Sequence, residues 1–197
     1  MLSRFKYNKQ VRSVRAFGLV ELIVCIGIML LVLSVTVTRQ SSFNGAVLLR
    51  NQAYELAFAI RQAQLLAVSG GDDSVRTYGI AVSNVTGQDS QYVLFADSVT
   101  ANGKYDVGEA IGLMGKLDSR FEIRDMYYNT NTKVVTGTSS ITFTRPNFDA
   151  RFCSTSSCNL ASPFFIDISR KGQTGITAGD VRRIEITSTG QISVVTY

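Results

Sequence analysis

The strongest pattern in the chain is an apolar run near its start. Between Phe17 and Val37 the only charged residue is Glu21. A helix rises about 1.5 Å per residue, so this run is about 30 Å long and matches the hydrocarbon core of a bilayer. The pattern predicts a membrane-spanning helix over 17–37. A carboxylate that faces lipid costs about 3 kcal/mol, so we expect Glu21 to be paired or functional.

A second helical pattern follows the apolar run. Small and large apolar residues recur at alternating gaps of four and three, which places them on one helix face. They are Leu49, Ala53, Leu56, Ile60, Ala63 and Ala67. We expect this stripe to pack on a globular domain rather than to form a free coiled coil, and the breakers at 69–73 to end the helix.

The Asn44-Gly45 pair lies between these two helical patterns. Glycine costs about 1 kcal/mol in a helix interior relative to alanine, so we expect the helix to bend or fray there. The polar run Thr38–Ser42 just before it is consistent with an exit from the membrane at this point.

From Ser74 onward the apolar residues follow a period of two, which is typical of strands with one buried face. Short polar loops separate these segments and favour antiparallel pairing. The predicted strands are Arg76–Val82, Gln91–Ala96, Phe121–Asp125, Ser139–Thr144, Phe164–Ser169, Arg182–Thr187 and Gln191–Thr196. Ser188-Thr189-Gly190 predicts a tight hairpin between the last two.

Together these patterns predict an α+β fold. The first half of a long N-terminal helix spans a membrane, and its second half packs on an antiparallel β-sheet domain. We expect a basic leader at 1–16, a membrane-spanning helix at 17–37, its amphipathic continuation at 38–70, and a globular β-rich head at 71–197.

The net charge of +5 comes from the first segment of the chain. Five basic residues and no acidic residue precede Phe17, namely Arg4, Lys6, Lys9, Arg12 and Arg15. The rest of the chain is balanced, so the charge does not by itself indicate a nucleic-acid partner. Basic residues ahead of an apolar run favour a cytoplasmic N-terminus and an exported C-terminal domain.

Two interpretations of the N-terminus follow. A secretory signal has a shorter apolar core and then a small-residue cleavage site, which Thr38-Arg39-Gln40 does not provide. In the first, the helix is an uncleaved bitopic anchor for an extracytoplasmic binding or sensor domain. In the second, the chain is cut ahead of the span, between Ala16 and Phe17.

The segment around that junction resembles the prepilin peptidase motif of type IV pilins and type II secretion pseudopilins. The matching residues are Arg15-Ala16-Phe17-Gly18-Leu19-Val20-Glu21-Leu22-Ile23. In that family a basic leader is removed on the cytoplasmic side, the new N-terminal residue, usually Phe, is N-methylated, and Glu is fifth in the mature chain. This sequence departs from the family in having Ala16 where Gly is usual, and in lacking the helix proline of many members.

The resemblance implies the pilin fold and a structural role as a minor pilin or pseudopilin. It implies processing between Ala16 and Phe17, N-methylation of Phe17, and a role for Glu21 in assembly. In a filament, the Glu21 carboxylate can neutralise the Phe17 amine of a neighbouring subunit, and such a charge-assisted contact is strong in a dry core.

The resemblance also implies where the protein is found and what it contacts. The implied location is the cytoplasmic (inner) membrane, with a single span and an extracytoplasmic C-terminal domain, and then a pilus or periplasmic filament. The implied partners are other pilin or pseudopilin subunits, the prepilin peptidase and the inner-membrane assembly platform.

Three further segments resemble the H-type minor pseudopilins. These are Leu56-Ala57-Phe58-Ala59-Ile60-Arg61-Gln62-Ala63-Gln64, Tyr78-Gly79-Ile80 and Thr189-Gly190-Gln191-Ile192.

The three cysteines fit an exported protein. Cys153 and Cys158 flank a short polar loop and are candidates for a local disulfide in an oxidising compartment. A zinc site needs more ligands, and the chain has no histidine. Cys25 lies in the apolar run and is interpreted as a small apolar residue.

One loop suggests a calcium site. Four residues with oxygen ligands surround Gly103 there, namely Asp97, Asn102, Asp106 and Glu109. Their spacing is not that of an EF-hand, because Val99 and Ala101 occupy would-be ligand positions, and an ordinary solvated turn is the alternative. No other cofactor is expected.

No catalytic pattern is present, and we expect the protein not to be an enzyme. Without histidine, nucleophilic catalysis needs a Ser-Lys pair or similar, and the serines are scattered in loops. Arg182 and Arg183, with Arg170-Lys171, form a basic cluster that could contact phosphates in a DNA-uptake minor pilin. The alternative is a strand edge kept soluble by charge, and a nucleic-acid partner is not the favoured interpretation.

Overall fold

The computed structural model describes residues 18–70, 77–85, 90–130, 132–134, 137–146, 148–173 and 179–196, without the side chains of 38–43. The predicted leader, the processing residues Ala16 and Phe17, and Arg76 lie outside these ranges. The chain divides into two compact units, Met1–Phe43 and Asn44–Tyr197.

The first unit contains the N-terminal part of helix α1 (Leu19–Ser69). Its segment Leu19–Val37 has a mean hydropathy of 2.7, and none of it is buried by the described residues. It is the one helix in the described part of the chain that is long and apolar enough to cross a membrane. This is consistent with the predicted single-pass anchor.

Helix α1 continues without interruption through Asn44 and Gly45, so the predicted fraying at this pair is wrong. The structure gives Gly45 another role. A β-carbon added to Gly45 would lie 1.4 Å from Nη2 of Arg170. The glycine therefore makes room for the Arg170 side chain against the helix surface instead of interrupting the helix.

The second unit begins with the remainder of α1, and the predicted apolar stripe is confirmed there. Its six residues, Leu49, Ala53, Leu56, Ile60, Ala63 and Ala67, are all buried, with exposed fractions of 1% or less. We call them the inner stripe. The helix ends at Ser69, where the breakers predict its end.

In the described residues after α1, ten strands form two five-stranded sheets in which every pairing is antiparallel. Sheet A has the order β3-β2-β1-β6-β7, and sheet B has the order β10-β9-β8-β4-β5. The strands are β1 (Thr77–Ser83), β2 (Gln91–Ala96), β3 (Gly115–Lys116), β4 (Phe121–Tyr128), β5 (Thr132–Lys133), β6 (Thr138–Thr144), β7 (Ala150–Cys153), β8 (Phe164–Arg170), β9 (Val181–Ile186) and β10 (Ile192–Thr196).

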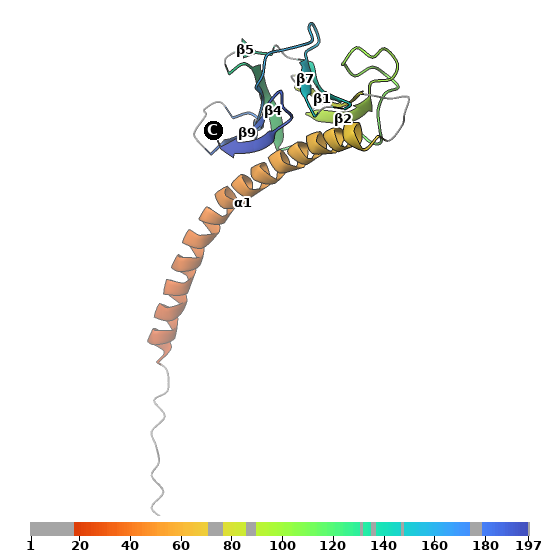
Figure 1. The fold of residues 1–197 in the computed structure, drawn as a ribbon. Helices are drawn as coiled ribbons and strands as arrows, with labels where there is room; N and C mark the ends of the chain where they lie inside the picture. The colour runs from red at the N-terminus through yellow and green to blue at the C-terminus, as the bar shows by residue number, and fades with distance from the viewer. Residues whose placement is uncertain are drawn as a thin grey trace, which may run out of the picture. The chain divides into compact units, whose positions relative to one another are not determined.

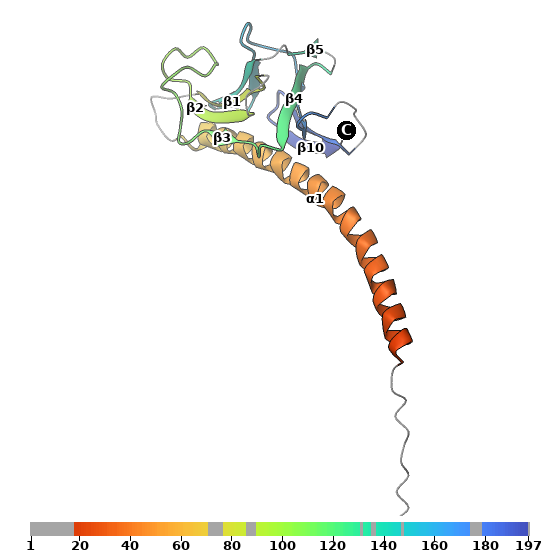
Figure 2. The ribbon, with the colours of Figure 1, turned by 180° about the vertical axis from the view of Figure 1, so that it is seen from behind.

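The inner stripe and both sheets share one apolar core. A single cluster joins it with Ile80 and Phe143 of sheet A and with Ile166 and Ile184 of sheet B. Both views show this part of α1 running along the two sheets (Figures 1 and 2). The α+β class and the packing of the helix on antiparallel strands are therefore observed.

The last hairpin forms as predicted, with Ile192 of β10 opposite Ile186 of β9. Its turn uses Gly190, which has a φ of 80°. A β-carbon at this position would lie 2.2 Å from the backbone oxygen of Phe148, so both the backbone angle and the close approach require glycine.

Candidate functional site

Glu21 lies in the first turn of α1, where a negative charge interacts favourably with the helix dipole. The first backbone hydrogen bond of the helix joins Leu22 N to Gly18 O at 3.2 Å. The neighbouring apolar side chains are widely exposed, at 75% for Leu19 and 58% for Ile23. Among the described residues no hydrogen bond or ion pair involves the Glu21 carboxylate.

The other polar groups of the span are suited to an apolar environment. The hydroxyl of Thr36 donates to the carbonyl oxygens of Leu33, at 2.9 Å, and Val32, at 3.2 Å. Such bonds satisfy a hydroxyl within its own helix. Cys25 is a free cysteine on the exposed helix surface. Glu21 is thus the one ionisable carboxylate of the described span.

The predicted calcium loop is built around two buried carboxylates whose oxygens all accept backbone N–H groups. Asp97 Oδ1 accepts from Asn102 N at 3.1 Å, and Oδ2 from Gly103 N at 2.8 Å. Glu109 Oε1 accepts from Ser98 N at 3.1 Å and Val99 N at 2.9 Å, and Oε2 from Asp106 N at 2.9 Å. These carboxylates fix the loop backbone.

The remaining loop side chains bond to one another. Asp106 Oδ2 accepts hydrogen bonds from the Thr100 hydroxyl and from Asn102 Nδ2. Burial raises the pKa of Asp97 above its ordinary value, while the N–H groups of Gly103 and Asn102 act in the opposite direction. The described residues contain no group of three or more His, Cys, Asp or Glu side chains arranged to hold a metal ion. Calcium binding stays a prediction.

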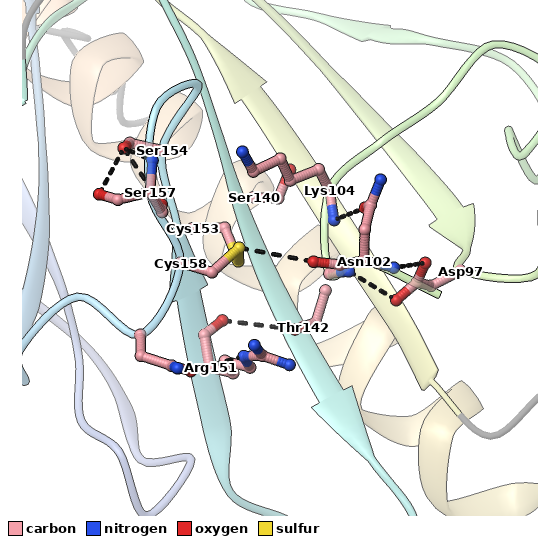
Figure 3. The surroundings of a disulfide bond; sticks show 12 residues. Asp97, Asn102, Lys104, Ser140, Thr142, Arg151, Cys153, Ser154, Ser157 and Cys158 are labelled. Atoms are coloured by element: carbon pink, nitrogen blue, oxygen red, sulfur yellow. Dashed lines mark hydrogen bonds between the residues drawn. A yellow bond between two sulfur atoms is a disulfide. The ribbon is translucent and has the colours of Figure 1, made fainter. Parts of the chain in front are cut away.

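Cys153 and Cys158 are joined by a disulfide. Figure 3 shows that this bond lies against the loop of Asp97 and Asn102: Sγ of Cys158 is 3.5 Å from the carbonyl oxygen of Asn102. Lys104 Nζ donates to Thr155 O at 2.9 Å. The disulfide therefore closes the short loop 153–158, and the hydrogen bond from Lys104 to Thr155 joins this loop to the one that contains Asp97 and Asn102.

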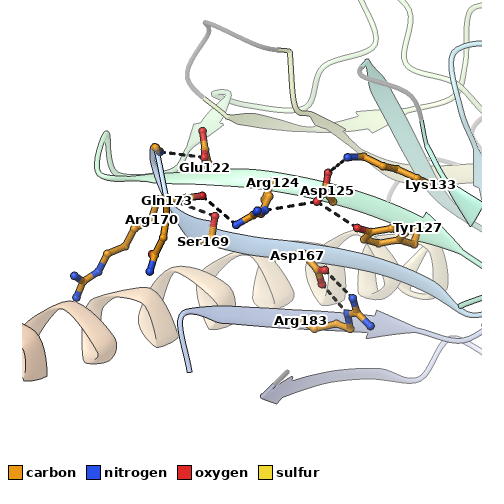
Figure 4. Close-up of polar contacts among 11 residues, drawn as sticks. Glu122, Arg124, Asp125, Tyr127, Lys133, Asp167, Ser169, Arg170, Gln173 and Arg183 are labelled. Atoms are coloured by element: carbon orange, nitrogen blue, oxygen red, sulfur yellow. Dashed lines mark hydrogen bonds and ion pairs between the residues drawn. The ribbon is translucent and has the colours of Figure 1, made fainter. Parts of the chain in front are cut away.

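The predicted DNA-contact residues do not form one basic patch. Arg182 and Arg183 are successive residues of β9, so their side chains leave opposite faces of sheet B. Arg183 Nε and Nη2 each donate to Asp167 at 2.7 Å (Figure 4). Arg182 Nη1 donates to the carbonyl oxygens of Val181 and Gly179 at 3.1 and 3.3 Å. Nucleic-acid contact by this pair stays a prediction without geometric support.

The outer face of sheet B carries a polar network that the sequence pattern did not indicate. Besides Asp167, the guanidinium of Arg183 lies over the rings of Tyr127, at 5.6 Å, and Phe165, at 5.0 Å. The Tyr127 hydroxyl donates to Asp125 Oδ2 at 3.2 Å, and Lys133 pairs with Asp125. The pairing depends on the register that places Asp167 opposite Arg183, and the periodic pattern of a single strand does not contain this register.

Of these groups, Glu21 is exposed and has no hydrogen-bond or ion-pair partner among the described residues. Comparisons with protein-family models, with curated proteins and with solved structures found no match to this chain. The features that bear on function are therefore Glu21, the apolar helix that carries it, and the Arg15–Ile23 motif that contains it.

Proposed function

We propose that this chain is a structural subunit, a minor pilin or pseudopilin, of a type IV pilus or a type II secretion filament, and that its fold is the pilin fold. The observation that carries the proposal is Glu21, a carboxylate in the first turn of an apolar helix whose span no described part of the chain covers. The motif from Arg15 to Ile23, which contains Glu21, also supports it.

The apolar helix needs an apolar environment around it. A helix that is apolar on all sides is stable in a bilayer or in a bundle of similar helices, but not in water. The subunit waits in the cytoplasmic membrane through Leu19–Val37 and then exchanges lipid for neighbouring helices. Apolar surface stays covered at both stages, so the exchange costs little.

Glu21 supplies the specificity that apolar contacts lack. Once the leader is removed, the Phe17 amine is a free cation, and the Glu21 carboxylate of a neighbour can pair with it. In a dry core, a charge without its partner is strongly unfavourable. The pair therefore fixes how far one subunit is displaced along the filament relative to the next. The β-rich head, packed on the second half of the helix, stays outside the core.

The test is Glu21→Ala in cells that carry the assembly system. The variant should still insert in the membrane, because it loses a charge from the span, but the yield of sheared filaments should fall at least about tenfold. Cys25→Ala is the matched control, since it changes another exposed residue of the span without changing charge. Wild-type filament yield from Glu21→Ala would favour an uncleaved anchor for a binding or sensor domain.

A further inference from the structure

The second half of α1 carries a second stripe, on the face opposite the inner stripe. Its residues again alternate at gaps of three and four, so they form a heptad pattern. They are Val47, Asn51, Tyr54, Phe58, Arg61, Leu65 and Val68. We call them the outer stripe. Five of the seven are apolar or aromatic, yet the side chains of Phe58 and Leu65 are 69% and 65% exposed.

A groove of about 510 Å³ lies at the middle of the outer stripe. It is lined by Asn51, Tyr54, Phe58 and Arg61 of the stripe, together with Glu55 and Ala57 of α1 and Val194 of β10. In heptad terms, Asn51, Phe58 and Leu65 occupy a positions, and Val47, Tyr54, Arg61 and Val68 occupy d positions. Side chains of a second helix at the same positions would fill such a groove as knobs fill holes.

The charges beside the groove identify the occupant. Arg50 is at a g position and Glu55 at the following e position, and both are exposed. In a parallel pair of helices, a g residue faces the e residue five positions further along the partner. Arg50 of each copy would then face Glu55 of the other. A pair of copies therefore has two attractive contacts between opposite charges. Neither residue forms an ion pair with another residue in the described part of the chain.

The polar residues within the stripe agree with this arrangement. A single Asn at an a position is known to select one register and a two-stranded state, and Asn51 occupies such a position. Arg61 would be unfavourable at a d position, but its Nη2 donates to Ile192 O of β10 at 3.1 Å, which draws the guanidinium to one side. Arg50 lies over the Tyr54 ring at 5.4 Å, close to the groove.

We propose that the outer stripe, residues 47–68 of α1, is a homotypic interface through which two copies of this chain pair in parallel. Parallel pairing suits a chain anchored through Leu19–Val37, because every copy enters the membrane in the same sense. An antiparallel pair would place Arg50 against g residues, which are Arg50, Ala57 and Gln64 and include no acid. The interface does not depend on the Phe17 amine or on filament assembly.

The test uses disulfide crosslinking of the full chain in membranes. Phe58→Cys places a thiol at the centre of the stripe, in a background with Cys25→Ser to remove the native free thiol and Glu21→Ala to prevent contacts that arise from filament assembly. Mild oxidation should give a crosslinked dimer. Val107→Cys is the control, because Val107 is 95% exposed but lies in the loop between β2 and β3.

Charge reversal then tests the Arg50–Glu55 contact. Recovery of the dimer when both variants are present would also show that each variant is folded. Arg50→Glu alone and Glu55→Arg alone each place like charges across the interface, so each should lower the dimer yield about fivefold or more. When the two variants are expressed together with different tags, both contacts become attractive, and the mixed dimer should form at the yield of the parent. Only a contact between two chains gives this result.

Three outcomes would overturn the proposal: equal crosslinking at Val107→Cys and Phe58→Cys, no effect of either reversal, or no mixed dimer from the two reversed variants. None of these would affect the proposed role in filaments, which depends on Glu21 and Phe17. Conversely, filament yields from Glu21→Ala leave the outer stripe untouched, so the failure of one proposal can be told from the failure of the other.

Discussion

Polar side chains in the head domain owe their positions to strand register. Asp167 and Arg183 are directly opposite in β8 and β9, and the pair is shielded from solvent, with 7% and 20% of the two side chains exposed. The Asp118–Arg120 pair has similar geometry but lies in water, at 37% and 61% exposure. The two Asp–Arg pairs therefore contribute differently to stability, because water screens the Asp118–Arg120 pair much more than the Asp167–Arg183 pair.

Arg183→Met should lower the free energy of unfolding by about 3 kcal/mol, because it leaves the buried Asp167 carboxylate without its partner. Arg120→Met is the control and should have little effect. Urea denaturation of the full chain in detergent, followed by the near-ultraviolet circular dichroism of its tyrosines, measures both. Equal losses for the two variants would show that the Asp167–Arg183 pair is not shielded as the structure indicates.

Ionisation of Tyr92 and Tyr127 makes the free energy of unfolding depend on pH in the alkaline range. Burial and the nearby Glu55 carboxylate raise the pKa of Tyr92 above 10.0, and burial and Asp125 raise that of Tyr127. The folded state thus holds these phenol protons more tightly than the unfolded state. Their contribution is complete below pH 10 and is lost as pH rises through the raised pKa values.

Tyr92→Phe should therefore reduce the decline in the unfolding free energy between pH 9 and 12, and Tyr92→Phe combined with Tyr127→Phe should reduce it further. Urea denaturation at each pH gives the slopes. An unchanged slope in the double variant would contradict this account of the two tyrosines.

Among the secondary-structure elements, the predicted helix face and most predicted strands agree with the structure. Apolar residues recur on the buried face of each element, so their spacing indicates both its type and that face. Strand β4 was predicted to end at Asp125 but continues to Tyr128. A bulge between Ile123 and Asp125 shifts the alternation, so the next buried residue is Met126 rather than residue 125. Strands β3 and β5 have two residues each, too few to show a period. Strand β7 also went unpredicted.

Leu56→Ala, on the inner stripe, should lower the free energy of unfolding by about 2–5 kcal/mol, because it opens a cavity between α1 and the sheets. Phe58→Ala is matched to it on the same helix but lies on the outer stripe. Under dilute conditions where the chain is monomeric, it should change stability by less than about 0.5 kcal/mol. A similar loss from both variants in urea denaturation would contradict the assignment of the two faces.

At the scale of the whole molecule, local pattern indicated the α+β class but not the division of the strands into two sheets. Strand β1 pairs with β6, and β4 pairs with β8, across long intervals of sequence. Such pairings depend on how apolar faces meet in three dimensions, which a period of two does not encode. Likewise, charge and motif indicated Glu21 as a functional residue, whereas the outer stripe became visible only when the structure showed which helix face the sheets cover.

The proposed role in filaments depends on a cut between Ala16 and Phe17, because the cut creates the amine that pairs with Glu21. The most direct test is mass spectrometry of the N-terminal peptide, on protein isolated from cells that carry the prepilin peptidase. We expect a chain that begins at Phe17 with one methyl group on its amine. A chain that still begins at Met1, with the basic leader attached, would contradict it and favour a tethered extracytoplasmic domain.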